Sequence, residues 1–385
     1  MRIWCSKIRQ SRRWLSVVVL LLVGLVFTGC TGAPTIPRGW SGGTVEGNNL
    51  YVGTMGGRLV AVNTDNGSLL WAAKLEMGVT SGGGLGCAQG PTTVAIYGAP
   101  AVSDNLVYVG GYNGKVYAYP SAGREEPKWL YPRQGNLAGP IVGSLVTAQG
   151  RVYFASASGT VYALDAAEGY KVWDFRTKEK IWSTPVIAGD TVFIGTFGKK
   201  LYALNIADGT KKWEFKAEGA IVATPVVDGN TVYIGSFDRK LYALDTATGS
   251  LKWKFPAVEE DENKPGKWFW AKPVVYNGVI YAASLDGKLY VLKTDNGQKV
   301  AEFDLNSPIS SSLILVGNSV VVATEGGIIY TVDTANNEKK KLASLGEKVF
   351  ASLSAGQGSV FVHTASDALY AVDAASGKKH EFTIK

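Results

Sequence analysis

Few side chains in this 385-residue sequence could carry out covalent or metal chemistry. His363 and His380 are the two histidines, which argues against a multi-histidine metal site. Cys87 could act as a nucleophile, but a thiol needs a base beside it, and neither histidine is near it in sequence. We therefore predict that Cys87 is a small residue in a Gly-rich loop, residues 78–90, and that the chain is not an enzyme.

Two further patterns resemble ligand sites only superficially. The acidic run at residues 259–262 could attract a cation, but calcium loops alternate their ligands and turn at a glycine, and this run does neither. The Gly-rich loop lacks the Gly-Lys-Ser/Thr of a phosphate loop and precedes no helix. Three cysteines cannot build a disulfide framework. We expect a solvated acidic loop, no metal and no cofactor.

The remaining chemistry is that of aromatic side chains, whose meaning depends on an internal repeat. The clearest copies are residues 181–213 and 221–253, and the base period is 40 residues. The tyrosine of Leu-Tyr-Ala-Leu is a convenient marker for each copy. It or its equivalent falls at Val60, Tyr117, Tyr162, Tyr202, Tyr242, Tyr290, Tyr330 and Tyr370. Length alone would suggest two or three domains, but eight copies of one repeat indicate a single repeat architecture instead.

Each copy contains four short segments of β-strand character. In the fifth copy they are residues 223–227, 231–236, 240–244 and 251–255, with the hairpin signal Asp-Gly-Asn at 228–230. A four-stranded antiparallel unit repeated at about 40 residues is typical of a β-propeller blade. We predict an all-β fold, a single eight-bladed β-propeller over residues 39–385.

A tryptophan recurs at the end of several copies. The run from Ala163 through Asp165 and Gly169 to Trp173 has equivalents that end at Trp71, Trp213 and Trp253. It resembles the tryptophan-docking motif of propellers of the pyrroloquinoline-quinone (PQQ) type. The acidic or amide residue caps a turn, the glycine supplies positive φ, and the indole wedges the outer strand against the next blade. We predict that these four tryptophans are structural.

Aromatic residues also recur at the position twenty residues before each marker. This position holds Trp40, Tyr97, Val142, Trp182, Val222, Trp270, Ser310 and Phe350. We call its five aromatic members the collar. The next position is small in all eight copies, as expected where inner strands crowd around the axis. The collar is therefore predicted at the start of the inner strands, near one mouth of the channel. Its rings either contact a ligand or peptide, or fill the wedge between blades.

Two insertions are further candidates for contact with a partner. Residues 256–272 lengthen one spacing by eight residues and carry Trp268, which precedes the repeat register. Loops often carry function and tryptophan is enriched in binding hot spots, so we place Trp268 among the candidate contacts. The Gly-rich loop at residues 78–90 is a candidate lid.

The first thirty residues are predicted to be a targeting segment that directs export and membrane attachment. Five basic residues precede an apolar run at 14–27 that is shorter than the ~20 residues of a membrane-spanning helix. Phe27-Thr28-Gly29-Cys30 resembles the bacterial lipobox, which implies lipidation at Cys30. We expect a signal peptide at 1–29 and a lipidated N-terminus and tether at 30–38, leading to the propeller at 39–385. An ordinary signal peptide or an uncleaved anchor with an incidental Cys30 is the alternative.

The charge balance argues against nucleic acid as a partner. The chain carries 39 basic and 32 acidic residues, a net charge of +7. Five of the basic residues belong to the predicted signal, and without them 34 face 32, about +2. The globular part has little net charge from which to build a basic face.

An eight-bladed PQQ-like propeller behind a lipoprotein signal resembles the BamB-type lipoproteins. The resemblance implies a non-catalytic scaffold of the outer-membrane β-barrel assembly machinery, presenting loops to an insertase and a strand edge to nascent barrel segments. We expect the propeller to be monomeric, because nothing in the sequence demands a second copy. In that family an N-terminal strand completes the last blade, whereas residues 377–384 are predicted here to supply its fourth strand.

The predicted location is the cell envelope, with the lipid anchor as the membrane contact. This means the periplasmic face of an outer membrane if the host has one, and otherwise the outer face of the cell membrane. The alternative functions are binding of a small molecule or glycan at the collar and PQQ-dependent oxidation. Many PQQ dehydrogenases are longer and carry a vicinal disulfide and a calcium ion, and this chain has no adjacent cysteines.

Overall fold

The computed structural model describes residues 39–75, 94–258 and 264–384, and every regular element in them is a β-strand. No helix in these three ranges is long and apolar enough to span a membrane. The predicted signal and tether with Cys30, the Gly-rich loop with Cys87 and the acidic run lie outside the described residues.

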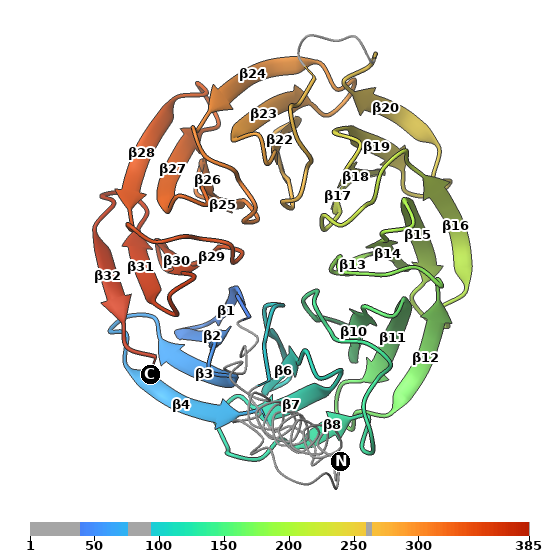
Figure 1. Cartoon of the computed structure of the whole chain (residues 1–385), viewed down its shortest axis with the longest axis vertical. Helices are drawn as coiled ribbons and strands as arrows, with labels where there is room; N and C mark the ends of the chain where they lie inside the picture. Colours follow the sequence, from blue (N-terminus) through green and yellow to red (C-terminus); the bar gives the residue numbers. More distant parts are fainter. Residues whose placement is uncertain (1–38, 76–93, 259–263, 385) are drawn as a thin grey trace, which may run out of the picture. The chain divides into compact units, whose positions relative to one another are not determined.

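The strands form eight antiparallel sheets of four strands each (Figure 1). The first four blades contain β1 (Gly43–Glu46), β2 (Asn49–Gly53), β3 (Arg58–Asn63) and β4 (Leu69–Lys74); β5 (Ala101–Ser103), β6 (Leu106–Gly110), β7 (Val116–Pro120) and β8 (Trp129–Tyr131); β9 (Val146–Ala148), β10 (Arg151–Ser156), β11 (Thr160–Asp165) and β12 (Lys171–Arg176); and β13 (Val186–Ala188), β14 (Thr191–Gly195), β15 (Lys200–Asn205) and β16 (Lys211–Lys216). The last four contain β17 (Val226–Asp228), β18 (Thr231–Gly235), β19 (Leu241–Asp245) and β20 (Leu251–Phe255); β21 (Val274–Tyr276), β22 (Val279–Ala283), β23 (Lys288–Lys293) and β24 (Lys299–Asp304); β25 (Ile314–Val316), β26 (Ser319–Ala323), β27 (Ile328–Asp333) and β28 (Lys339–Ser344); and β29 (Ser354–Gly356), β30 (Ser359–His363), β31 (Leu369–Asp373) and β32 (Lys379–Phe382).

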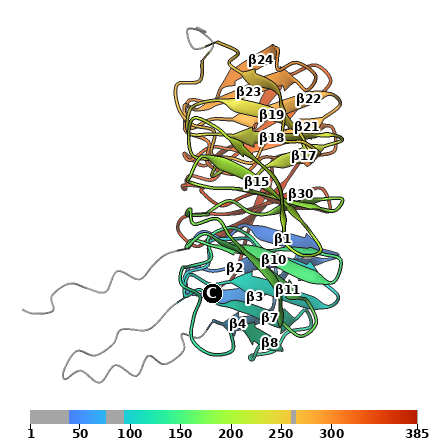
Figure 2. The same cartoon turned by 90° about the vertical axis from the view of Figure 1, so that its right-hand side faces the viewer.

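Each sheet is built from consecutive strands, so one blade is one sequence repeat. In Figure 1 the first strand of each blade lies nearest the central channel and the fourth lies at the rim, and Figure 2 shows the blades from the side. The eight-bladed β-propeller is confirmed. The predicted fourth strand at the C-terminus is also confirmed, because β32 pairs with β31 in the last sheet.

The inner strands are shorter than the sequence suggested. In the fifth blade we predicted a first strand at residues 223–227, whereas β17 is Val226–Asp228. Residues 223–225 are not paired in the sheet, and the carbonyl of Ala223 accepts a hydrogen bond from Ser183 of the previous blade at 3.3 Å. The expected position of the collar is corrected accordingly, since Trp182 lies four residues before β13 rather than at its start.

The middle strands of a blade are buried on both faces, and the outer strands are not. In β15, residues 201–204 are all buried, as expected for a strand between two neighbouring sheets. In β16, Lys211, Lys212, Glu214 and Lys216 are exposed. The apolar cores therefore lie between blades, and the stability of the ring depends on how each blade packs against the next.

Five tryptophans fasten one blade to the next. Trp173 donates from Nε1 to the carbonyl of Ile206 in the following blade at 3.0 Å. Its indole covers Gly209, where a Cβ would lie 2.6 Å from the ring and φ is +74°. The structure places Trp71, Trp213 and Trp253 in the same way. Trp129 does so as well, although an insertion in its copy hides it from the sequence pattern.

The junction that closes the ring, between the eighth and first blades, lacks this tryptophan. Glu381 occupies the equivalent sequence position, and the next residue, Phe382, covers Gly67, where a Cβ would lie 2.5 Å from its ring. The Arg58 guanidinium donates to the carbonyl of Ile384 at 2.9 Å. A phenyl ring and side-chain hydrogen bonds, rather than a shared strand, thus hold the first and last blades together.

His363 also contributes to this closing junction. Its equivalents in the other blades are Gly or Ala and face a bulky residue of the next blade; a Cβ on Gly195 would lie 2.5 Å from Ile221. In the first blade the equivalent of Ile221 is the small residue Gly39. At this junction the large side chain is therefore contributed by His363 of the eighth blade. It is 2% exposed, with Nδ1 2.9 Å from the Ser41 carbonyl and Nε2 3.0 Å from Asp367 Oδ1.

Replacing Trp173 should separate the hydrogen bond of the indole from its packing. Trp173→Phe keeps most of the ring and loses the bond to Ile206, at an expected cost of about 1 kcal/mol. Trp173→Ala removes the ring and should cost about 3–5 kcal/mol. Urea unfolding followed by circular dichroism measures both. Equal costs for the two variants would contradict the packing role.

Replacing His363 by the alanine found at this position in other blades should destabilise the protein. His363→Ala removes a buried side chain and its contacts with Ser41 and Asp367, at an expected cost of about 2–4 kcal/mol in the free energy of unfolding. The control is His380→Ala on the exposed outer strand, with an expected change within about 0.5 kcal/mol. A stability unchanged by His363→Ala would show that this side chain does not hold the junction.

Candidate binding site at the mouth of the channel

In the chain segment that leads into each inner strand, successive side chains point alternately into the wedge, meaning the apolar space between two neighbouring blades, and into the channel. The position just before the collar is fully buried and belongs to the cores between blades. From the second blade to the eighth it holds Ile96, Ile141, Ile181, Ile221, Phe269, Ile309 and Val349. These residues fill the wedge, which leaves the next residue of each segment on the channel side.

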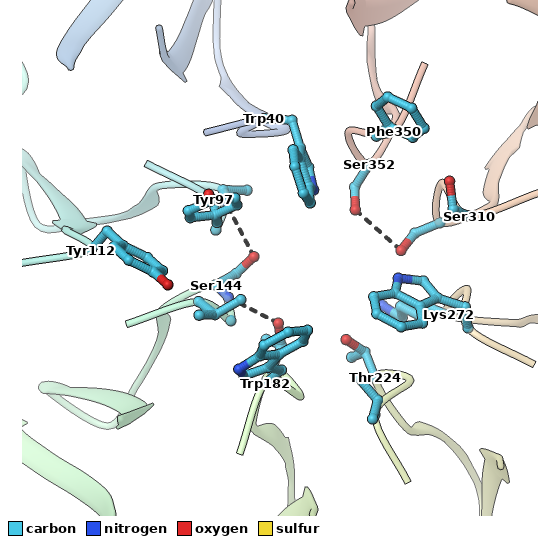
Figure 3. Close-up of a pocket in the computed structure, with 18 residues that line it drawn as sticks. Trp40, Tyr97, Tyr112, Ser144, Trp182, Thr224, Lys272, Ser310, Phe350 and Ser352 are labelled. Atoms are coloured by element: carbon cyan, nitrogen blue, oxygen red, sulfur yellow. Dashed lines mark hydrogen bonds between the residues drawn. The ribbon is translucent and has the colours of Figure 1, made fainter. Parts of the chain in front are cut away.

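All five collar residues line one cavity at the channel mouth. Its volume is about 300 Å³, and its walls include Trp40, Tyr97, Trp182, Trp270 and Phe350. Trp40 and Trp182 are 42% and 41% exposed. In Figure 3 the labelled side chains surround an open centre and come from segments all around the ring.

The collar rings also contact one another across blade boundaries. The ring centroids of Trp40 and Tyr97 are 4.8 Å apart in an edge-on arrangement, and those of Trp40 and Phe350 are 5.8 Å apart. Tyr112, on the turn between β6 and β7, extends this group at 5.2 Å from Tyr97. Burial, followed by the neighbouring Tyr112, raises the pKa of Tyr97. The Tyr97 phenol is therefore neutral at neutral pH.

A second aromatic group continues from the collar onto the neighbouring turns. Trp268 stacks on Phe237 with centroids 4.5 Å apart and planes 13° apart, and Trp270 stacks on Phe237 at 5.6 Å. Phe197 meets Trp182 edge-on at 5.0 Å. Trp268 is 45% exposed and lies outside the cavity wall. We call the five residues of this group the aromatic surface.

Sequence reasoning missed three of these rings. Tyr112, Phe197 and Phe237 all lie five residues before the marker of their copy. An aromatic residue at that register position in three copies was the available signal. It was not visible as a binding feature, because the turn between the second and third strands approaches the collar only in the folded ring.

A ring of hydroxyl groups lies two residues further along each segment. This position holds Gly42, Ala99, Ser144, Thr184, Thr224, Lys272, Ser312 and Ser352. We call its five serine and threonine members the hydroxyl ring, and all five line the cavity. The Ala99 amide donates to Ser144 Oγ at 2.9 Å and the Ser144 amide to Thr184 Oγ1 at 2.9 Å. Ser352 Oγ donates to Ser312 Oγ at 3.1 Å.

Lys272 is the charged member of this ring. It is the one charged side chain among the described residues that line the cavity. Lys272 is exposed to the channel but surrounded by protein, and this desolvation lowers its pKa from the ordinary lysine value. Sequence reasoning missed Lys272, although a lysine at a register position that holds Ser, Thr, Gly or Ala in the other seven copies was an available signal.

The titratable side chains of the described residues do not gather into a metal site. Within them, no three His, Cys, Asp or Glu side chains gather as a metal site would require. His363 belongs to the ring-closing junction, and His380 lies on the exposed outer strand β32. The chemistry available at the mouth is stacking, hydrogen bonding and a single positive charge.

Comparison with known proteins points to one family. The family model described as outer membrane protein assembly factor BamB matches residues 33–175, 133–338 and 257–380. The outer membrane protein assembly factor BamB of Shewanella oneidensis is 26% identical over 165 residues. That match covers 40% of this chain and 37% of the relative, little more than a third of the relative's length.

Solved structures share the fold at low identity. BamB from Moraxella catarrhalis has a TM-score of 0.68 at 17% identity, covering 86% of this chain and 95% of that chain. The computationally designed Ika8 protein has a TM-score of 0.70 at 17% identity, covering 90% of this chain and 96% of that one. These likenesses concern the fold alone.

A collar tryptophan should matter less to stability than a docking tryptophan. Trp182→Ala removes two ring contacts from a side chain that is 41% exposed, so we expect a cost of about 1–2 kcal/mol in the free energy of unfolding. This is well below the cost expected for Trp173→Ala. Urea unfolding of the two variants side by side provides the measurement. A collar variant as unstable as the docking variant would assign the collar to packing.

Proposed function

The chain belongs to the family of the outer membrane protein assembly factor BamB, and from this premise we propose that it is a non-catalytic, lipid-anchored scaffold of the cell envelope. Its partner is the outer-membrane β-barrel assembly machinery, and the channel mouth with the aromatic surface is the contact. The observation that carries the assignment of the contact is the pair of exposed indoles, Trp182 and Trp268, packed against the half-buried rings of Phe197 and Phe237.

The aromatic surface has the properties of a protein-binding hot spot. Large aromatic side chains supply much contact area with few rotatable bonds, and tryptophan is enriched among the residues that dominate binding energy. Here Phe197 and Phe237 lie on turns between the second and third strands of their blades, and stacking on Phe237 fixes Trp268 and Trp270. Little ordering is needed before such a surface binds, which favours affinity.

The proposed anchor would hold this mouth close to the membrane. Cys30 and Gly39 are nine residues apart, and a fully extended chain of that length reaches about 30 Å. Gly39 immediately precedes the collar residue Trp40. A protein lipidated at Cys30 therefore keeps the channel mouth within about 30 Å of the membrane surface. Two or more acyl chains at this cysteine would provide stable anchoring.

The rim of the ring is a poorer candidate for strand addition. The outer strands β16 and β28 begin with Lys211 and Lys212 and with three consecutive lysines, respectively. Lysine on an edge strand is a common protection against pairing with another chain. We therefore place partner binding at the mouth and not at the strand edge that the family resemblance suggested.

Cross-linking in native membranes tests the proposal. We expect the wild-type protein to co-purify with a β-barrel insertase of the outer membrane. The double variant Trp182→Ala/Trp268→Ala should recover at least tenfold less insertase, because the exposed rings are lost. Tyr170→Ala is the matched control, since Tyr170 is 59% exposed and lies outside both the cavity and the aromatic surface.

Each arm of this experiment has an outcome against the proposal. Absence of any insertase in the wild-type capture would overturn the partner. Equal recovery with the double variant would overturn the mouth as the contact. Cys30→Ser should release the protein from the membrane fraction, and retention of that variant would overturn the lipid anchor.

A further inference from the structure

We propose that the channel mouth is also a binding site for a small aromatic carboxylate, whose carboxylate contacts Lys272 and the hydroxyl ring while its ring lies in the collar. This site does not depend on the scaffold role. It rests on the charge of the cavity, on the hydrogen-bond donors around Lys272 and on the spacing of the two rings.

The cavity has a positive charge without a counter-charge in its wall. Lys272 occupies a position where the other blades have Ser, Thr, Gly or Ala. None of the described lining residues is acidic. Desolvation is the one influence on the pKa of Lys272, with no carboxylate acting on it from the described residues. A cation in a confined site is unfavourable until an anion pairs with it, so an anionic ligand gains a favourable contact there.

The hydroxyl ring supplies donors suited to the same anion. The oxygens of Ser144, Thr184 and Ser312 each accept a hydrogen bond, from the amides of Ala99 and Ser144 and from Ser352. A hydroxyl has one proton, and an oxygen that accepts in this way still has that proton to donate. Ser312 and Thr224 belong to the blades on either side of Lys272. An oxyanion at Lys272 therefore has hydroxyl donors beside it.

The charge and size of the site favour an aromatic carboxylate. A phosphate monoester carries about −1.5 to −2 charges at pH 7, more than one lysine neutralises, whereas a carboxylate carries one. The collar and hydroxyl ring are two residues apart, about 7 Å of extended chain. A volume of about 300 Å³ is at the lower end for small-molecule sites and fits a bicyclic ring.

Calorimetric titration of the full-length protein in detergent with 2-naphthoate tests this inference. We expect one binding site, with the neutral 2-naphthamide at least tenfold weaker because it lacks the charge. Lys272→Ser should bind naphthoate at least tenfold more weakly and the amide unchanged. This variant installs the serine that three other blades have at this position, so the fold should be retained. Lys348→Ser is the control, because Lys348 is an exposed lysine two residues before Phe350 and outside the cavity wall.

The alternative results are also informative. Equal affinity for naphthoate and naphthamide, or an unchanged affinity in Lys272→Ser, would overturn the anion site. Tighter binding of 2-naphthyl phosphate than of naphthoate would overturn the carboxylate and identify a phosphate ligand. Absence of binding by all three probes would overturn the site altogether. None of these results bears on recovery of an insertase, so the two proposals fail separately.

Discussion

The crowding of chain segments around the axis is the constraint on which the mouth of this propeller depends. A Cβ on Gly98 would lie 2.4 Å from the carbonyl oxygen of Gly143, and one on Gly143 would lie 2.7 Å from that of Ser183. Neighbouring segments therefore touch backbone to backbone at this level. Ser183 and Ser41 turn the contact into hydrogen bonds to the facing carbonyls of Ala223 and Gly98. We call the position of Gly98, Gly143 and Ser183, one residue after the collar, the contact position. Because its side chains face the neighbouring segment, the residues before and after it must point into the channel.

That geometry explains how one short stretch of sequence serves both packing and recognition. The wedge residue is apolar because it lies between two sheets, and the collar residue is free to vary because it faces solvent. The residue after the contact position faces the channel again, one layer deeper, where hydroxyl groups can bond to neighbouring segments. Lys272 departs from this pattern at a place where packing imposes no lysine. Such departures from a repeat point to function more directly than the repeat itself.

The fold could be read from the sequence because its period is local. Forty residues contain a complete sheet with its turns, so a repeated pattern of short strands was sufficient to predict eight blades. The collar was also visible, because all its members share one register position. Trp129 was hidden by an insertion, and the rings of Phe197 and Phe237 were hidden because turn and collar meet only across a blade boundary. The roles of Phe382 and His363 depend on partners more than three hundred residues away, which no local pattern reveals.

The coincidence of each blade with one repeat affects how the protein can fold. In a propeller whose last sheet contains strands from both ends of the chain, that blade cannot form until the whole chain has been synthesised. Here every sheet pairs strands that are close in sequence, so most contacts within a blade are of low contact order and can form as the chain is synthesised. The slow, long-range step is reduced to docking a finished eighth blade against a finished first one. Until that docking occurs, the apolar faces that the first and eighth blades present to each other are open to solvent.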